Sequence, residues 1–205
     1  MKLNINKEQI ITQLQSLAAV ADKKQTLPIL SNILIKADEE EITLKSTDLE
    51  VELEFVISHK SETTGEITVP AKKIADIIKE LPDGPINFEL NEDATKLLIK
   101  SSSGRYNLST IPASDFPDFD VVKSDQTYNI ASESLITLIQ KTSFAMANQD
   151  WRHYLNGCLF QKSLNDLVMV ATDAHRLATY TLPLEQEGEF SGIIPRKTII
   201  ELLKI

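Results

Sequence analysis

One feature of this 205-residue chain limits its possible folds more than any other, because the same pattern occurs in it twice. Residues 4–79, moved forward by 125 positions without a gap, align with residues 129–204. Thr47 then coincides with Thr172, and the residues around each pair keep their chemical character. A fixed period of this kind indicates that one supersecondary plan is used twice.

Hydrophobic periodicity divides the chain into helices and strands. Apolar residues recur at helical spacing in four segments, which with their immediate flanks are 7–24, 70–80, 131–152 and 194–204. Pro70 and Pro195 stand where a helix should begin. Apolar and polar residues alternate between the helices, which predicts strands with one solvated face. These alternating segments are 42–45, 49–55 and 86–90.

A weaker internal repeat within the first copy leads to the predicted fold class. Residues 42–53 resemble residues 97–108 at a shift of 55 positions, so each domain should contain two copies of a helix followed by several strands. We therefore predict an α+β fold of internally repeated domains, in which antiparallel sheets carry two helices per domain on one face.

The repeat also gives the expected domain boundaries. A stretch rich in proline and acidic residues after Thr110 is typical of an exposed connector, so we expect a first domain over residues 1–125 and a second over 126–205. The first copy continues through residues 80–125, whereas the sequence ends where the counterpart of that stretch should begin. We therefore expect the second domain to be truncated in its C-terminal half.

Charge is distributed unevenly along the chain. The four helical segments carry eleven basic and seven acidic residues, a net of +4, although the whole chain has a net charge of −9 and the remainder therefore −13. Basic helices on an acidic body indicate one surface that faces phosphates. Lysines on the solvated face of any helix would produce the same asymmetry, so charge alone does not decide.

The usual signatures of catalysis are missing from the sequence. It contains no phosphate-binding glycine loop, no G-x-S-x-G elbow and no HExxH or paired CxxC spacing, so we predict no catalytic residue, no metal and no cofactor. A hydrolase using Asp173 and His175 is the least favoured alternative. The first copy has Thr47-Asp48 at the same place but Glu50 where His175 stands, which favours a shared turn.

The cysteine content and the N-terminus point to a reducing compartment. Cys158 is the chain's one cysteine, in a strand-like segment where a buried hydrophobic role is expected. Neither a signal peptide nor an apolar run long enough to span a membrane is present, so we expect a cytoplasmic protein without a membrane partner.

Segment 149–155 is unusual, since it combines Trp151, His153 and Tyr154 with Arg152 in a polar setting. Amphipathic rings and arginine supply binding energy at interfaces and stack on bases. A plug of aromatic residues that closes the core between helix and sheet would have the same composition. Both interpretations stay open at this point.

Seven motifs in order resemble the β sliding-clamp family of bacterial DNA polymerase III, over the whole of the chain. The motifs are Leu27–Leu34, Ser46–Glu50, Val69–Lys73, Leu108–Pro117, Tyr154–Gly157, Ala171–Ala178 and Ile194–Lys197. The resemblance implies a ring of two chains with three similar domains each, in which helices line the hole and sheets form the outer wall. Such a ring slides on duplex DNA and tethers the polymerase without catalysing a reaction.

The resemblance also implies site residues and partners. The expected partners are duplex DNA, DNA polymerase III and other clamp-binding polymerases or repair proteins, the clamp loader, and a second copy in a homodimer. Positions that match the family's DNA contacts are Lys24, Lys72, Gln149, His153 and Tyr154. Positions that match one wall of the peptide-binding pocket are Leu155, Thr172, Ala174, His175, Arg176 and Leu177. Tyr106 and Leu108 match the subunit interface.

Three positions depart from the family pattern: Lys24 stands where arginine is familiar, His153 where tyrosine is, and Ala174 where glycine is common. The third domain and the opposite pocket wall have no counterpart in this sequence, so we expect this chain to be unable to close a ring. The alternative function is a protein-interaction scaffold that does not bind DNA. Net positive charge on the helices distinguishes the two, because a scaffold does not require it.

Overall fold

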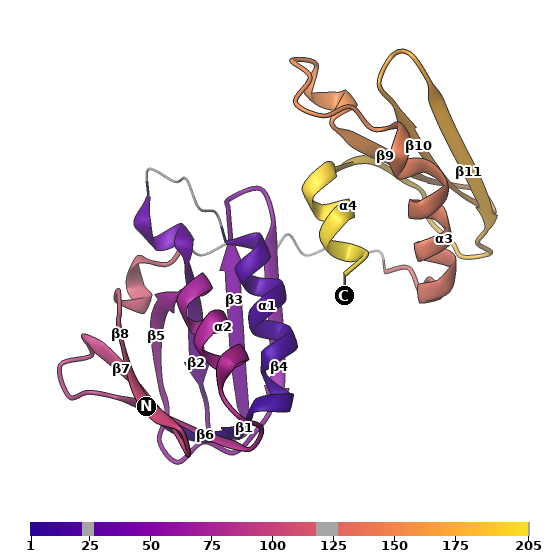
Figure 1. Ribbon diagram of the computed structural model, residues 1–205. Helices are drawn as coiled ribbons and strands as arrows, with labels where there is room; N and C mark the ends of the chain where they lie inside the picture. Colours follow the sequence, from indigo (N-terminus) through magenta and orange to yellow (C-terminus); the bar gives the residue numbers. More distant parts are fainter. Residues whose placement is uncertain (22–26, 118–126, 205) are drawn as a thin grey trace. The chain divides into compact units, whose positions relative to one another are not determined.

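The structure is a computed structural model that describes residues 1–21, 27–117 and 127–204. Contacts divide the chain into two compact units, Met1–Phe119 and Asp120–Ile205, and each unit is described by itself (Figure 1). The division falls a few residues before the boundary at 125 that the sequence predicted. In the part of the chain that is described, no helix is long and apolar enough to cross a membrane.

Unit 1 consists of two copies of one strand–helix–strands motif. The first motif contains β1 (Lys2–Asn6), α1 (Ile11–Val20), β2 (Asn32–Ala37), β3 (Glu41–Thr47) and β4 (Glu52–Ser58). The second contains β5 (Gly65–Pro70), α2 (Ala71–Glu80), β6 (Pro85–Leu90), β7 (Lys96–Ser101) and β8 (Gly104–Ser109). This duplication confirms the weaker internal repeat and the α+β class that the sequence predicted.

The two motifs exchange their first strands. One sheet has the order β4-β3-β2-β5 and the other β1-β6-β7-β8, so β5 joins the strands of the first motif and β1 those of the second. All pairs are antiparallel, with Ile33 opposite Val69 in one sheet and Leu3 opposite Phe88 in the other. Each sheet therefore needs both motifs.

Both helices of unit 1 lie side by side on one face of the strands (Figure 1). Leu14 and Leu17 of α1 and Ile74 and Ile78 of α2 are fully buried, at the i, i+3 and i+4 spacing of an amphipathic helix. They pack in one core with the inward residues of the strands, among them Phe88. Burying each such side chain stabilises the unit by about 1.5–3 kcal/mol.

Unit 2 repeats this plan from α1 to α2. Its elements are α3 (Ser132–Thr142), β9 (Gly157–Ser163), β10 (Asp166–Thr172), β11 (Leu177–Pro183), β12 (Phe190–Pro195) and α4 (Arg196–Leu202). The sheet order β11-β10-β9-β12 equals β4-β3-β2-β5 of unit 1. The bounds of β10, β11 and β12 are those of β3, β4 and β5 displaced by 125 positions, which confirms the repeat.

Several predicted details are confirmed. Pro70 and Pro195 immediately precede the first residues of α2 and α4. Cys158 is fully buried, and burial raises the pKa of its thiol to about 11, so the thiolate nucleophile is suppressed.

One predicted element was too long. The strand expected over 49–55 begins at Glu52, because the side chains of Thr47 and Asp48 bind the backbone of residues 49–51 in a turn. In the segment 131–152, which was predicted as a helix with its flanks, the α-helix covers Ser132–Thr142, and the ring-bearing stretch from Gln149 follows it as expected. In that stretch, Asp150 binds the backbone N–H of Arg152, and such local bonds compete with helix formation.

The contact between β9 and β12 gives a testable prediction about stability. A Cβ on Gly157 would lie 2.5 Å from the Ile194 carbonyl oxygen, whereas a Cβ on Gly192 of the paired strand would meet nothing within 4 Å. We expect Gly157→Ala to lower the free energy of unfolding by about 1–3 kcal/mol, since overpacking forces the strands apart. Gly192→Ala is the matched control and should change it by less than about 0.5 kcal/mol. Urea denaturation followed by circular dichroism measures both, and equal effects would contradict the prediction.

Candidate functional site

The β10–β11 connection is a tight turn built on Thr172 and Asp173. The Thr172 hydroxyl donates to the Arg176 carbonyl at 2.7 Å and accepts the Ala174 N–H at 3.1 Å. Asp173 Oδ1 accepts the N–H groups of Arg176 and His175 at 3.0 Å, and these bonds lower the pKa of its carboxyl group. Ala174 has φ of 73°, a left-handed conformation that costs a residue with a Cβ about 1–2 kcal/mol. Glycine would avoid that cost.

Unit 1 contains the same turn 125 residues earlier. The Thr47 hydroxyl donates to the Val51 carbonyl at 2.9 Å, and Asp48 Oδ1 accepts the N–H groups of Glu50 and Val51. Leu49 has φ of 74°. The pair of turns confirms the structural interpretation of Thr-Asp. In unit 2 the aspartate is engaged by backbone N–H groups, which argues against a hydrolytic pair with the neighbouring histidine.

Two sets of side-chain contacts hold the loop after α3. The Asn156 side chain accepts the Asp150 N–H at 2.9 Å and donates to the Asp150 carbonyl at 2.8 Å. The Asp150 carboxylate in turn accepts the Arg152 backbone N–H at 2.9 Å and is paired with its guanidinium at 2.9 Å. Hydrogen bonding to Arg152 lowers the pKa of Asp150 to about 2, so the carboxylate of the Asp150–Arg152 pair stays charged at neutral pH.

Aromatic rings of this loop and its flanks point to solvent. Trp151 is 83% exposed, Tyr154 61% and Phe144 58%. The Arg152 guanidinium lies 5.7 Å from the centroid of the Trp151 ring, within the range of a cation–π contact. The interpretation of this segment as an aromatic core plug is therefore wrong, because its Trp and Tyr rings face solvent and Leu155 is its one buried apolar side chain.

The loop and the turn form the two walls of one groove of about 610 Å³. The groove is lined by Met146, Ala147, Asn148, Gln149, Asp150 and Trp151 on one wall and by Asp173, His175 and Arg176 on the other. Arg176 ties the walls together, since its Nη2 donates to the Phe144 carbonyl at 2.7 Å.

The predicted pocket residues are distributed around this groove. His175 and Arg176 line it, and Thr172 and Ala174 shape the turn that carries them. Leu177 is 65% exposed at the start of β11, whereas Leu155 is 5% exposed. The wall over 146–151 was not part of the predicted pocket. The only sequence signal for it is the unusual density of rings and arginine in 149–155.

The predicted DNA contacts fall on two surfaces and one undescribed stretch. Gln149 lines the groove of unit 2, and His153 and Tyr154 are exposed in the short 3-10 turn His153–Leu155. Lys72 is exposed on α2, beside a shallow hollow of about 250 Å³ between the two helices of unit 1. Lys24 lies outside the described residues.

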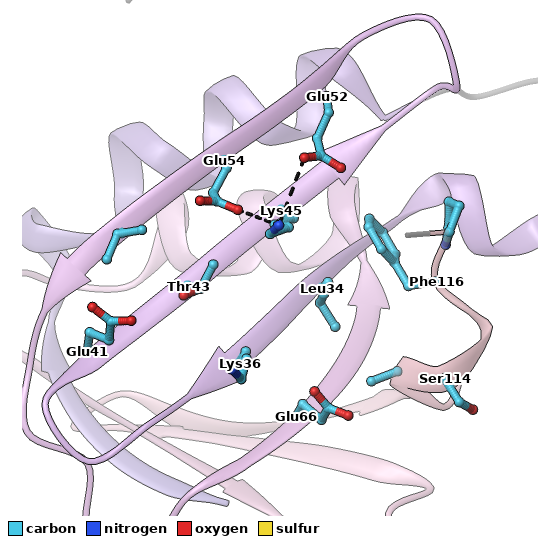
Figure 2. A pocket seen from close by; sticks show the side chains of 13 residues that line it. Leu34, Lys36, Glu41, Thr43, Lys45, Glu52, Glu54, Glu66, Ser114 and Phe116 are labelled. Atoms are coloured by element: carbon cyan, nitrogen blue, oxygen red, sulfur yellow. Dashed lines mark ion pairs between the residues drawn. The ribbon is translucent and has the colours of Figure 1, made fainter. Parts of the chain in front are cut away.

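The opposite face of unit 1 is acidic. A groove of about 590 Å³ crosses the outer face of the sheet β4-β3-β2-β5 (Figure 2). Lys45 pairs there with Glu54 at 2.5 Å and lies 3.9 Å from Glu52. Four glutamates and two lysines line this groove, which leaves it a net charge of −2. The glutamates are Glu41, Glu52, Glu54 and Glu66.

The two predicted interface residues lie on β8, an edge strand of the second sheet of unit 1. Tyr106 is 38% exposed, whereas Leu108 is 6% exposed and belongs to the core. No group of three or more metal-ligating side chains occurs among the residues described.

Comparison with known proteins gives a consistent result. Residues 1–120 match the family described as DNA polymerase III beta subunit, N-terminal domain, and residues 129–205 match its central domain. The chain is 43% identical over 208 residues to the beta sliding clamp of Pseudomonas putida, covering 100% of this chain and 56% of that clamp.

Solved structures agree with the sequence comparison. The crystal structure of DNA polymerase III subunit beta from Pseudomonas aeruginosa has a TM-score of 0.93 and 42% identity, covering 100% of this chain and 56% of that one. A second structure from that species, a sliding clamp bound to griselimycin, has the same score, identity and coverage. The chain thus spans little more than half the length of these relatives, and it belongs to the DNA polymerase III beta subunit family.

Proposed function

We propose that this protein works as a DNA sliding clamp in the cytoplasm. It holds duplex DNA through phosphate contacts and binds DNA polymerase III, other polymerases or repair proteins and the clamp loader through a peptide groove. It makes and breaks no covalent bond. Its two units correspond to clamp domains over residues 1–125 and 126–205. The separation of charge between the two faces of unit 1 is the observation that carries the proposal.

The helix face of unit 1 is the surface that DNA approaches. The exposed charged residues of α2 are Lys72, Lys73, Asp76, Lys79 and Glu80, a net charge of +1, whereas the groove on the outer sheet face has a net charge of −2. Duplex DNA has one negative charge per about 1.7 Å, so the carboxylates repel it and the lysines attract it. Flexible lysines on a helix contact phosphates and do not read bases, which permits sliding.

The groove of unit 2 is the surface that takes a peptide. It offers a concave site with polar groups fixed by the Thr-Asp turn and with exposed apolar side chains at its margin. The P. aeruginosa clamp named above was solved with griselimycin bound. We assign binding of griselimycin to this groove and to Leu177 beside it.

We assign the first-domain side of the full-length clamp's subunit interface to the edge strand β8. Among the residues that the structure describes, β8 pairs along its length with β7 alone, so its other edge is available for pairing. Tyr106 supplies an exposed ring at this edge, while Leu108 supports the strand from the core.

A charge-matched pair of variants tests the DNA surface. We expect Lys72→Ala to weaken duplex binding similarly for every DNA sequence. The plot of log affinity against log salt concentration should become less steep by about 0.9, the contribution of one phosphate contact. Lys36→Ala removes the same charge from the acidic sheet face and should leave affinity unchanged or slightly higher. Fluorescence anisotropy with two unrelated duplexes at several salt concentrations measures this. If the two variants lost affinity equally, the assignment of the helix face as the DNA surface would be wrong. If the wild type did not bind duplex DNA, the alternative function as a protein-interaction scaffold would be favoured.

A second pair of variants tests the peptide groove. Leu177 and Leu164 are both highly exposed leucines of unit 2, at 65% and 80%, but only Leu177 lies at the β10–β11 turn. We expect Leu177→Ala to weaken griselimycin binding by about 1–2 kcal/mol, roughly tenfold, through the apolar area no longer buried. Leu164→Ala should have no effect. Calorimetric titration decides, and equal affinities for both variants would place the ligand elsewhere.

A further inference from the structure

Trp151 is the most exposed large apolar residue in the part of the chain that the structure describes. It is 83% exposed, although tryptophan is usually mostly buried and dominates the energetics of the surfaces on which it lies. The core of unit 2 is complete without it, since the buried cluster there does not include this ring. Stability of the fold therefore does not explain its position.

The residues on both sides of Trp151 are held by hydrogen bonds. Asp150 is held by the Asn156 amide, and Arg152 is held by the Asp150 carboxylate. Gln149 adopts a left-handed conformation with φ of 58°, a strain that the surrounding bonds maintain. A ring presented by a preorganised loop loses less conformational entropy when a ligand covers it.

The surroundings of Trp151 favour a peptide over a nucleic acid. Trp151 lines the same groove as His175 and Arg176. The two carboxylates of this groove outnumber its one arginine, and each is already paired with an arginine, Asp150 with Arg152 and Asp173 with Arg176. Such a lining offers no surplus positive charge to phosphates, whereas a large ring offers apolar area to a side chain.

We propose that Trp151 is the aromatic anchor of the peptide groove and selects ligands that place a flat apolar side chain, an aromatic ring or a proline, against its indole. The inference rests on the proposed peptide-binding function and adds a specificity-determining residue to it. Arg152 supports the ring by its cation–π contact, and the opposite wall with His175 and Arg176 holds the peptide backbone against it.

Ligand binding at Trp151 can be followed by tryptophan fluorescence, because Trp151 is the only tryptophan of the chain. We expect titration of the full 205-residue chain with griselimycin to shift the tryptophan emission to the blue, with the same Kd that calorimetry gives. Trp151→Ala should raise that Kd about tenfold, as loss of a buried aromatic anchor does. Trp151→Phe, which retains a ring, should stay within about threefold, and Leu164→Ala should match the wild type. Circular dichroism melts check that each variant is folded.

The alternatives give different results. Griselimycin could bind by calorimetry without shifting the emission of the wild type and with the same Kd for Trp151→Ala. The peptide groove would then stand, and the role of Trp151 would be overturned. If duplex or single-stranded DNA shifts the emission and griselimycin does not, Trp151 belongs to the DNA surface and the proposal is likewise overturned. If calorimetry detects no griselimycin binding to the wild type, the proposed peptide function falls and the inference falls with it.

Discussion

The exchange of first strands between motifs is the constraint on which the rest of the structure depends. β5 completes the sheet of the first motif, and β12 takes the same place in unit 2. Each of these strands passes directly into a helix at a proline, Pro70 or Pro195. Buried polar groups fix the exchange in unit 1, where Asn32 donates to the Thr68 hydroxyl at 3.0 Å and Thr68 donates to the Ile111 carbonyl at 2.8 Å. Breaking it would leave these groups unpaired at a cost of about 1–3 kcal/mol each.

The separation of charge follows from this arrangement. With the helices on one face, alternation along β3 and β4 sends every second side chain to the other face, where Glu41, Glu52 and Glu54 reach solvent. The solvated side of α2 is left to carry the lysines. A chain with net charge −9 can therefore present a positive surface to phosphates, because strand periodicity and helix periodicity assign the two signs to different sides.

The sequence predicted what depends on periodicity and failed where side chains bind the local backbone. The repeat, the helix starts at Pro70 and Pro195, and the buried Cys158 all follow from spacing, and all are present. The turn at Leu49 was predicted as part of a strand, because hydrogen bonds from aspartate and threonine side chains are not visible as a hydrophobic period. The wall of the groove over 146–151 was missed for the same reason. Its shape depends on contacts between Asp150, Arg152 and Asn156 that composition does not reveal.

The two copies share one turn and differ in the residues beside it. The Thr-Asp turn is present in both units with the same bonds and the same left-handed residue, so it serves the fold in each. The copies differ beside it, where Glu50 is replaced by His175 and the plain segment 24–30 by the ring-bearing segment 149–155. The groove of unit 2 lies beside this shared turn, where Arg176 stands in place of Val51 and adds bonds of its own, from Nε to Asp173 Oδ2 at 3.0 Å and from Nη2 to the Phe144 carbonyl at 2.7 Å. The groove of unit 2 thus arises from divergence around a conformation that the repeat had already fixed.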